Sequence, residues 1–337
     1  MRDPRIAREL EAHPAIGIHR LVLPTPFPIG PVNSYLLEDD PLTLVDAGPN
    51  SATALTVLEQ ELATLGHKVE DLGLILVTHQ HLDHIGLIGV LAQRSGADVG
   101  ALDRLAPWLA AFDESMGLQH DYADEVMATH GVPREVRVAV RTLSARLVGW
   151  GAAATVNVPL AHGARLSLRD RTLTALHRPG HSPSDTVFWD EGNRVMLGGD
   201  HLLPEVSSNP VIARPLEGPS QGRPQTLVTY LESLRTTASC DLGMILPGHG
   251  SAIHEHRPLI AERMAMHDRR RQQLHDLIAR RPQTAYELAI EIWGPDVAAG
   301  QALLTISEVL GHVDLLLNDG QVVEHSDHSG HSRFTVP

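Results

Sequence analysis

The chain has 337 residues and a formal net charge of −14 with histidine counted as neutral. This acidic balance argues against tight binding to phosphate backbones, which depends on lysine and arginine. A single cysteine, Cys240, excludes an intrachain disulfide, and we expect it to be a small packing residue rather than a nucleophile. Hydrophobic residues make up 42% and charged residues 20% of the chain, which is enough for a substantial core and, at this length, for two domains.

No apolar segment of the chain approaches the length of a membrane span. Residues 1–17 also lack the apolar run of a secretory signal. We therefore expect a cytoplasmic protein that does not enter a membrane. A homodimer is compatible with the sequence, which does not fix the oligomeric state.

The first part of the chain alternates predicted strands with predicted helices. Short apolar runs broken by proline and glycine predict strands, whereas leucines three or four residues apart predict helices. The predicted strands lie within residues 18–45 and at residues 72–77, and the predicted helices cover residues 51–65 and 85–95. Ser51 is the expected N-cap of the first helix, and Gly66 and Gly96 end the two helices.

Residues 78–84 read Thr-His-Gln-His-Leu-Asp-His and directly follow the predicted strand at 72–77. Imidazole and carboxylate groups suit Zn²⁺ and neighbouring divalent metals. A tight loop at a strand end can direct some of these side chains at one metal and the others at a second. Seven candidate ligands occur along the chain: His79, His81, Asp83, His84, His181, Asp200 and His249.

A long insert, residues 101–160, follows the first half of the core. It contains Trp108, Phe112 and Met116 and has helical spacing in parts. We expect a helical cap beside the metal site, and the alternative is a packing element far from it.

The second half of the core returns to strands that lead into the later candidate ligands. Predicted strands cover residues 172–177, 186–189, 194–197 and 244–246, and a predicted helix covers residues 225–238. The first, third and fourth of these strands precede His181, Asp200 and His249. A proline-rich loop, residues 203–224, follows Asp200. Loops after metal-bearing strands commonly border the pocket, so its Ser207, Asn209 and Arg214 are candidate substrate-binding residues.

The composition changes near residue 256. Helices are predicted over residues 257–281, 285–293 and 297–318, the last broken near Gly311. Thr284 and Glu287 form a capping box for the second of these helices. Two short strands, residues 322–324 and 334–336, complete a pattern of three helices and a hairpin.

The ordered candidate ligands resemble those of the metallo-β-lactamase-fold hydrolase superfamily. Residues 32–37 and 44–48 resemble its first strands, with Asp46 at the usual acidic position before a glycine. The resemblance covers residues 17–255 and implies an α/β fold, a four-layer αββα sandwich. The C-terminal pattern resembles the β-lactamase-associated winged helix of one branch. We therefore predict a catalytic domain over residues 1–255, with a helical insert at 101–160, and a winged-helix-like domain over residues 256–337.

The resemblance also implies how the ligands are shared. It assigns His79, His81 and His181 to one metal, Asp83, His84 and His249 to the second, and Asp200 to both. It further implies a metal-bound hydroxide and Asp83 as the catalytic groups. Two divalent ions are expected, zinc first, with iron or manganese able to use the same ligands. Metal binding lowers the pKa of water from about 15.7 towards about 7. Asp46 either orients a ligand histidine or hydrogen-bonds its own turn.

These features favour a hydrolase of a thioester, ester or lactone, with a small-molecule acyl substrate for the apolar cap. The alternative is a metal-dependent endoribonuclease for single-stranded RNA. RNA binding needs basic and aromatic side chains, yet the chain is only 4% aromatic, and residues 262–337 hold seven arginines against eleven acidic residues. A β-lactam hydrolase and a winged-helix regulator are weaker alternatives.

Overall fold

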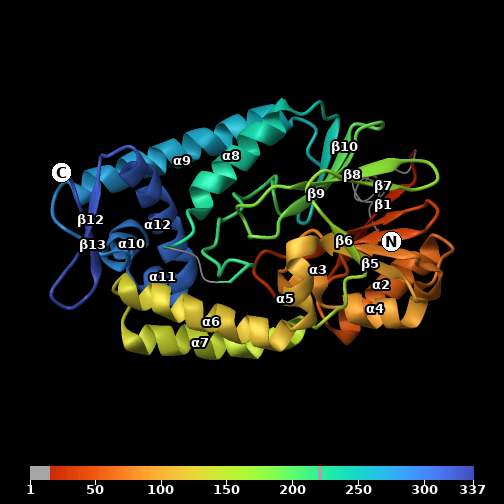
Figure 1. Ribbon diagram of the computed structural model, residues 1–337, viewed down its shortest axis with the longest axis horizontal. Coiled ribbons are helices and arrows are strands. Elements are labelled where there is room, and N and C mark those ends of the chain that lie inside the picture. The colour runs from red at the N-terminus through yellow and green to blue at the C-terminus, as the bar shows by residue number, and fades with distance from the viewer. Residues whose placement is uncertain (1–15, 219–221) are drawn as a thin grey trace, which may run out of the picture.

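The computed structural model describes residues 16–218 and 222–337 and contains two facing sheets beside a helical region (Figure 1). The first sheet has six strands in chain order: β1 (Ile18–Leu23), β2 (Val32–Leu37), β3 (Thr43–Val45), β4 (Leu74–Leu76), β5 (Asp98–Leu102) and β6 (Val158–Leu160). The pairings from β1 to β3 are antiparallel and those from β3 to β6 are parallel. Parallel neighbours need long crossovers, and helices α2 (Ala52–Thr64) and α4 (Ile88–Ser95) lie in two of them.

The second sheet has five strands, and its order is the reverse of the chain order. From one edge to the other it runs β11 (Met244–Pro247), β10 (Val195–Gly199), β9 (Thr186–Asp190), β8 (Thr172–His177) and β7 (Ala164–Ser167). The pairing of β10 with β11 is parallel and the others are antiparallel. The four predicted strands of this half are therefore present, each within two residues of its expected ends.

Three apolar clusters define the layers. One lies between the sheets and joins Leu37 and Leu76 of the first sheet to Phe188 and Leu246 of the second. A second lies between the first sheet and helices α2 and α4. The third lies between the second sheet and helices α8 (Thr226–Ser239) and α9 (His256–Ile278). The order helix, sheet, sheet, helix is the expected αββα arrangement.

In the first half of the core, the predicted helix at 85–95 has the wrong bounds, whereas the one predicted at 51–65 agrees with α2 to within one residue. The predicted helix at 85–95 is divided into α3 (Leu82–Ile85) and α4. At the junction, Gly86 lies so close to the backbone of Asn50 and Trp150 that an added Cβ would overlap both. The amide of Leu87 donates to the carbonyl of Gly48, 3.2 Å away, instead of to a helical partner. Two predicted helix ends are confirmed. At the start of α2 the Ser51 hydroxyl accepts from the Ala54 amide, and at the end of α4 Gly96 has a left-handed backbone conformation.

The predicted insert, residues 101–160, is helical in its middle, where it contains α5 (Ala106–Ala110), α6 (Phe112–Thr129) and α7 (Arg134–Leu147). Its predicted bounds are too wide, because its first two residues end β5 and its last three form β6. In Figure 1, α6 and α7 extend side by side from the sheets to the C-terminal region. Val126 and Met127 of α6 share an apolar cluster with Leu310 and Val313 of the C-terminal region. The insert therefore links the core to the last part of the chain.

The C-terminal region has α9, α10 (Ala285–Trp293), α11 (Pro295–Gly300), α12 (Ala302–Asn318) and a hairpin of β12 (Val323–Ser326) and β13 (Ser332–Thr335). The capping box of Thr284 and Glu287 is present. The predicted break near Gly311 is wrong, because the helix is interrupted at Gln301 instead. Gly311 lies inside α12, where a Cβ would be 2.7 Å from that of Leu227 in α8. It allows close helix packing rather than a turn.

None of the helices in the described part of the chain is both long and apolar enough to cross a membrane.

A buried ion pair ties the start of the first sheet to the second. The Arg171 Nε donates to Asp39 at 2.8 Å, and both side chains are almost fully buried. Burial raises the pKa of Asp39, but hydrogen bonds from Arg171 and from two backbone amides outweigh this and lower the pKa below its ordinary value. Arg171 also donates to the carbonyl of Ile16 at 2.7 Å.

We expect Arg171→Met to lower the free energy of unfolding by about 3–5 kcal/mol, because it leaves the Asp39 carboxylate buried and unpaired. Urea denaturation followed by circular dichroism measures this loss. The control is Arg194→Met, which removes an exposed pair with Asp241 and should cost less than about 1 kcal/mol. Equal losses in the two variants would contradict the assignment.

Candidate metal centre

The candidate ligands come from the ends of strands in both sheets. His79 and His81 follow β4, and the next turn of the chain, α3, carries Asp83 and His84. Asp200 follows β10 directly, and His249 lies two residues after β11. His181 lies in the loop between β8 and β9. Because these ends meet at one edge of the sandwich, ligands 170 residues apart can gather in one place.

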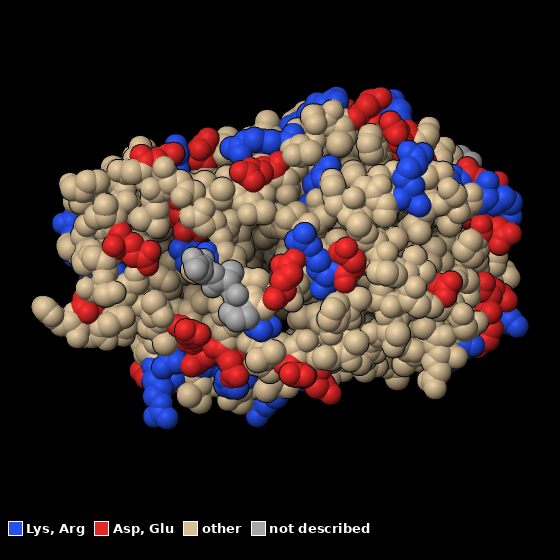
Figure 2. Space-filling model, in the orientation of Figure 1, with Lys and Arg blue, Asp and Glu red and all other residues tan. Residues whose placement is uncertain are grey.

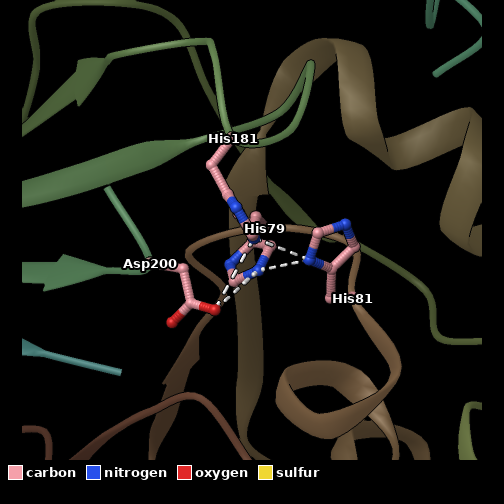
Figure 3. A group of neighbouring side chains, drawn as sticks. All are labelled: His79, His81, His181 and Asp200. Atoms are coloured by element: carbon pink, nitrogen blue, oxygen red, sulfur yellow. Dashed lines mark hydrogen bonds and ion pairs between the residues drawn. The ribbon is translucent and has the colours of Figure 1, made fainter. Parts of the chain in front are cut away.

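The first group contains His79, His81, His181 and Asp200, which can each offer one ligand atom within 4.8 Å of the others. Figure 3 shows the three rings and the carboxylate directed at a common point. The His81 Nδ1 lies 3.1 Å from the Nε2 of His79 and 2.9 Å from the Nε2 of His181. Nitrogens around a tetrahedral zinc with Zn–N bonds of about 2.0–2.1 Å lie about 3.3 Å apart, so this spacing suits one ion.

The second group contains Asp83, His84 and His249, and all three residues are buried. The His249 Nε2 lies 3.3 Å from the Asp83 Oδ2. Asp200 lies between the two groups: its Oδ1 is 3.5 Å from the His84 Nε2, and its Oδ2 is 3.6 Å from the Nε2 atoms of both His181 and His249. A carboxylate in this position can contact two cations at once.

The outer nitrogens of four rings have hydrogen-bond acceptors, which fixes which nitrogen faces the site. The His181 Nδ1 donates to the carbonyl of Asn209 at 3.1 Å, and the His249 Nδ1 donates to that of Pro31 at 2.8 Å. The His79 Nδ1 lies 3.0 Å from the Thr78 hydroxyl. Metal-binding histidines usually hold their other ring N–H in this way. The Nε2 lone pairs are therefore free to bind a cation.

Asp46 holds the fourth ring. Its Oδ2 accepts from the His84 Nδ1 at 2.7 Å and from the Thr78 hydroxyl at 2.7 Å, and its Oδ1 accepts from the Thr78 amide at 2.9 Å. Asp46 has a φ of 59°, which places it in the left-handed region directly after β3. Of its two predicted roles, the contact with His84 matches the orientation of a candidate ligand. Through Thr78, Asp46 also reaches His79.

The electrostatics divide the histidines into two kinds. Burial and the neighbouring rings lower the pKa of His81 to about 3 and place that of His79 well below its ordinary value. Both are therefore neutral and able to bind a metal. Burial also lowers the pKa of His84, but the carboxylates of Asp200, Asp46 and Asp83 outweigh it and raise the pKa well above its ordinary value. The surroundings of His84 thus favour positive charge.

Two buried atoms at the centre make no hydrogen bond within the described part of the chain. They are the His84 Nε2 and the Asp200 Oδ1, which face each other across 3.5 Å. Unsatisfied buried polar atoms are rare in native proteins, and a bound ion is one of the partners that can satisfy them. Imidazole and carboxylate are suitable ligands for a divalent cation. The residues present therefore fit divalent metal ions such as zinc, iron or manganese.

The loop after Asp200 was predicted to bind substrate. Asn209 contacts the site through its carbonyl, which holds His181. Arg214 lines a neighbouring cavity with Tyr122 and Glu125, and that cavity includes no candidate ligand among its described residues. The Ser207 hydroxyl is buried without a hydrogen-bond partner among the described residues. Substrate binding by these three side chains stays a prediction.

C-terminal helices hold this loop in place. Arg263 of α9 donates to the carbonyls of Leu203, Pro204 and Val206 at 3.1–3.4 Å. The Ser307 hydroxyl of α12 accepts from the Ile212 amide at 3.0 Å. Because the same loop carries Asn209, the C-terminal region supports the orientation of His181.

A cavity of about 230 Å³ lies against the first ligand group, and both His81 and His181 contribute to its wall. Its apolar lining comes from four parts of the chain: Leu82, Trp108, Met116, Leu147, Val211 and Leu303. The insert thus borders the candidate metal centre, as expected of a cap. Sequence reasoning missed Val211 and Leu303, because only the packing of the C-terminal region against the loop brings them here.

Residues 28–249 match the family described as the Metallo-beta-lactamase superfamily. A probable metallo-hydrolase of Bacillus subtilis, YqjP, is 31% identical over 294 residues, which are 87% of this chain and 90% of that protein. A crystal structure of a metallo-beta-lactamase family protein from Thermus thermophilus, TTHA1429, is 27% identical, with a TM-score of 0.78 and coverage of 95% of this chain and 99% of the other.

Two shorter similarities involve proteins with different named activities. An exodeoxyribonuclease of Streptococcus pneumoniae, WalJ, is 45% identical over 73 residues, 21% of this chain and 26% of that protein. An acyl-coenzyme A thioesterase of Gallus gallus, MBLAC2, is 32% identical over 136 residues, 35% of this chain and 48% of that protein. Neither covers enough of its relative to carry that activity over. The broad matches and the His/Asp clusters positioned to bind metal agree, and the chain belongs to the metallo-beta-lactamase superfamily as a hydrolase.

Proposed function

We propose that this hydrolase uses two divalent ions to cleave a thioester or ester with an apolar acyl group. The observation that carries the proposal is the pairing of two ligand groups around Asp200 with an apolar cavity that begins at His81 and His181. Bound ions of this kind would lower the pKa of a water molecule towards about 7, and their positive charge would polarise a carbonyl group. Zinc suits the ligand set best, and iron or manganese would be held by the same atoms.

In this proposal each residue has a defined task. His79, His81 and His181 hold one ion, Asp83, His84 and His249 hold the other, and Asp200 contacts both. Asp46, Asn209 and Pro31 fix the rings from behind, so the ligands need little reorganisation when an ion or a substrate arrives. Burial raises the pKa of Asp83, but His84 and His249 outweigh it, so its carboxylate stays ionised. An ionised Asp83 can hold a cation and orient a water molecule beside it.

The lining of the cavity favours an acyl substrate over RNA. Its described residues include no lysine, arginine, aspartate or glutamate, and their exposed area is mainly apolar. Single-stranded nucleic acid needs a basic track with stacking aromatic side chains. Figure 2 draws one face of the molecule, on which acidic and basic side chains are interspersed without a continuous basic band among the described residues. A metal-dependent endoribonuclease is therefore the second candidate, and we place a β-lactam hydrolase and a winged-helix regulator below it.

We further propose that residues 256–337 are a winged-helix-like domain with a supporting role. Helices α9, α10 and α12, with the short α11 between the last two, followed by a hairpin support this assignment. Its apolar residues pack against α6 of the insert and against Ile212, and Arg263 holds the loop that carries Asn209. Such a domain shapes the site from behind instead of presenting a helix to nucleic acid. A cytoplasmic location and a homodimer remain part of the proposal.

We expect the zinc- or manganese-loaded protein to hydrolyse acyl thioesters or esters, and to lose this activity when the metal is removed with a chelator. A panel of acyl thioesters, esters, lactones, a β-lactam and labelled single-stranded RNA and DNA measures the preference. The chelated protein, and the same protein with metal restored, are the controls. Metal-dependent cleavage of the nucleic acid with every acyl substrate untouched would reverse the order of the two candidates.

We expect Gly248→Ala to abolish binding of at least one ion and at least 90% of the activity. A Cβ at Gly248 would overlap the Asp200 Oδ1 and lie 2.7 Å from the His84 Cε1. Metal content per chain, determined by plasma mass spectrometry, measures the loss. In the control, Gly192→Ala, the new Cβ is 3.6 Å from its nearest neighbour, so both ions should remain. Full metal content in Gly248→Ala would show that Asp200 and His84 do not hold an ion there.

We expect Asp46→Ala to weaken metal binding by about 10- to 100-fold, because it removes the acceptor that orients His84. Competition with a chromophoric chelator measures the affinity, and circular dichroism verifies that the variant is folded. Asp241→Ala, which removes an exposed carboxylate paired with Arg194, is the control. If the folded Asp46→Ala protein bound metal as tightly as the parent, Asp46 would only hydrogen-bond its own turn and would not orient His84.

A further inference from the structure

The cavity beside His81 and His181 has a definite shape, because several packed elements form its walls. The ring of Trp108 packs edge-to-face on Phe112, with 5.6 Å between ring centroids. Leu82, Trp108 and Met116 also pack against the core cluster under the first sheet. Leu303 of α12, which is also part of the wall, packs against the C-terminal cluster. A cavity with walls of this kind selects its occupant by size.

The polar groups in the wall carry no charge for the occupant. The Gln119 Oε1 accepts from the Arg214 amide at 2.8 Å, and the side-chain amide of Gln119 carries no charge. Burial, and then the nearby Arg141, lower the pKa of His120, so its ring is neutral. Ser144 adds only a hydroxyl. An occupant with a carboxylate at its far end would lose its hydration without meeting a cationic side chain among the described residues of the wall.

The volume limits how much of an occupant the apolar wall can cover. A dry apolar cavity of about 150 Å³ holds benzene, which has six non-hydrogen atoms. By the same measure this cavity of about 230 Å³ has room for about nine non-hydrogen atoms. An octanoyl group and a phenylacetyl group both have nine. Shorter groups leave part of the apolar wall unused, and longer ones extend beyond it.

We propose that this cavity is the acyl-binding site of the enzyme and that it selects an uncharged acyl group of about eight carbon atoms. The carbonyl lies at the His81 and His181 end, and the chain lies between Trp108 of the insert and Leu303 of α12. This inference rests on the proposed acyl hydrolase function. It adds that the insert and the C-terminal region jointly set the length of the substrate.

The test is a series of N-acetylcysteamine thioesters with acyl chains of two to sixteen carbons, so that the leaving group stays constant. We expect kcat/KM to rise by about fourfold for each added CH₂ up to about eight carbons, and then to level off or fall. An eight-carbon acyl group that ends in a carboxylate should be cleaved at least tenfold less efficiently than octanoyl. A flat profile from two to sixteen carbons would overturn the inference.

Two neighbouring leucines provide a matched pair of variants. Leu303 lines the cavity, whereas Leu304 is 40% exposed and is not part of its lining. Leu303→Trp should shift the preference to chains of about four carbons and reduce cleavage of the octanoyl thioester at least tenfold. Leu304→Trp should keep the profile of the parent protein. Trp108→Ala, if it folds, should shift the preference to longer chains. Identical profiles for the two leucine variants would also overturn the inference.

A binding measurement separates this inference from the proposed function. Nonan-2-one presents the carbonyl and chain of an octanoyl group but cannot be hydrolysed, and calorimetry can compare it with butan-2-one. We expect only the longer ketone to bind, and Leu303→Trp, but not Leu304→Trp, to abolish binding. If no thioester or ester is hydrolysed while the ketone still binds in this pattern, the proposed function is wrong and the apolar site stands. If hydrolysis occurs without this binding pattern, only the acyl site is wrong.

Discussion

The buried carboxylate of Asp200 is the constraint on which the rest of the site depends. It lies within 4.0 Å of four histidines, and its Oδ1 has no hydrogen bond among the described residues. Burial raises the pKa of Asp200, but His84, His249 and His79 outweigh it and hold the pKa well below its ordinary value. An ionised group this deep is costly unless cations surround it. Either the histidines around Asp200 carry protons or metal ions take their place, and the neutral His79 and His81 favour the second state for the first group.

Close backbone packing explains how the fold holds the seven candidate ligands in fixed positions. Gly199, at the end of β10, has a φ of 49° and leaves no room for a Cβ beside Thr78. Gly248 leaves none beside Asp200. The amide of Gly248 donates to the carbonyl of Gly199 at 2.7 Å, so the ends of β10 and β11 are bonded directly behind the site. Glycine at these points lets the two sheets approach until their ligands meet.

Local pattern was enough to predict most strands of the two sheets and the residues that gather at their edge, because each candidate ligand follows an apolar strand within a few residues. It missed β5, β6 and β7. The same reasoning failed where packing between distant segments decides the outcome. Gly311 has the sequence signature of a helix break, but it lies in a continuous helix because α8 approaches it closely. Helix 85–95 is divided because the backbone of Asn50 and Trp150 occupies the space beside Gly86. Leu303 carried no signal at all, since its place in the cavity depends on how α12 meets the loop after Asp200.

The part of the chain outside the family match is therefore not independent of the chemistry inside it. The match ends at residue 249, yet Arg263 and Ser307 fix the loop that holds His181, and Leu303 forms part of the cavity wall. The likeness to the Thermus thermophilus structure covers 95% of this chain, so the C-terminal region belongs to an architecture that the two proteins share. In such an arrangement the candidate metal ligands at the strand ends can stay the same while residues of the insert and of the last helices, which line the cavity, vary with the substrate. Selection for a new substrate would then alter side chains such as Trp108 and Leu303 and leave the buried charges around Asp200 untouched.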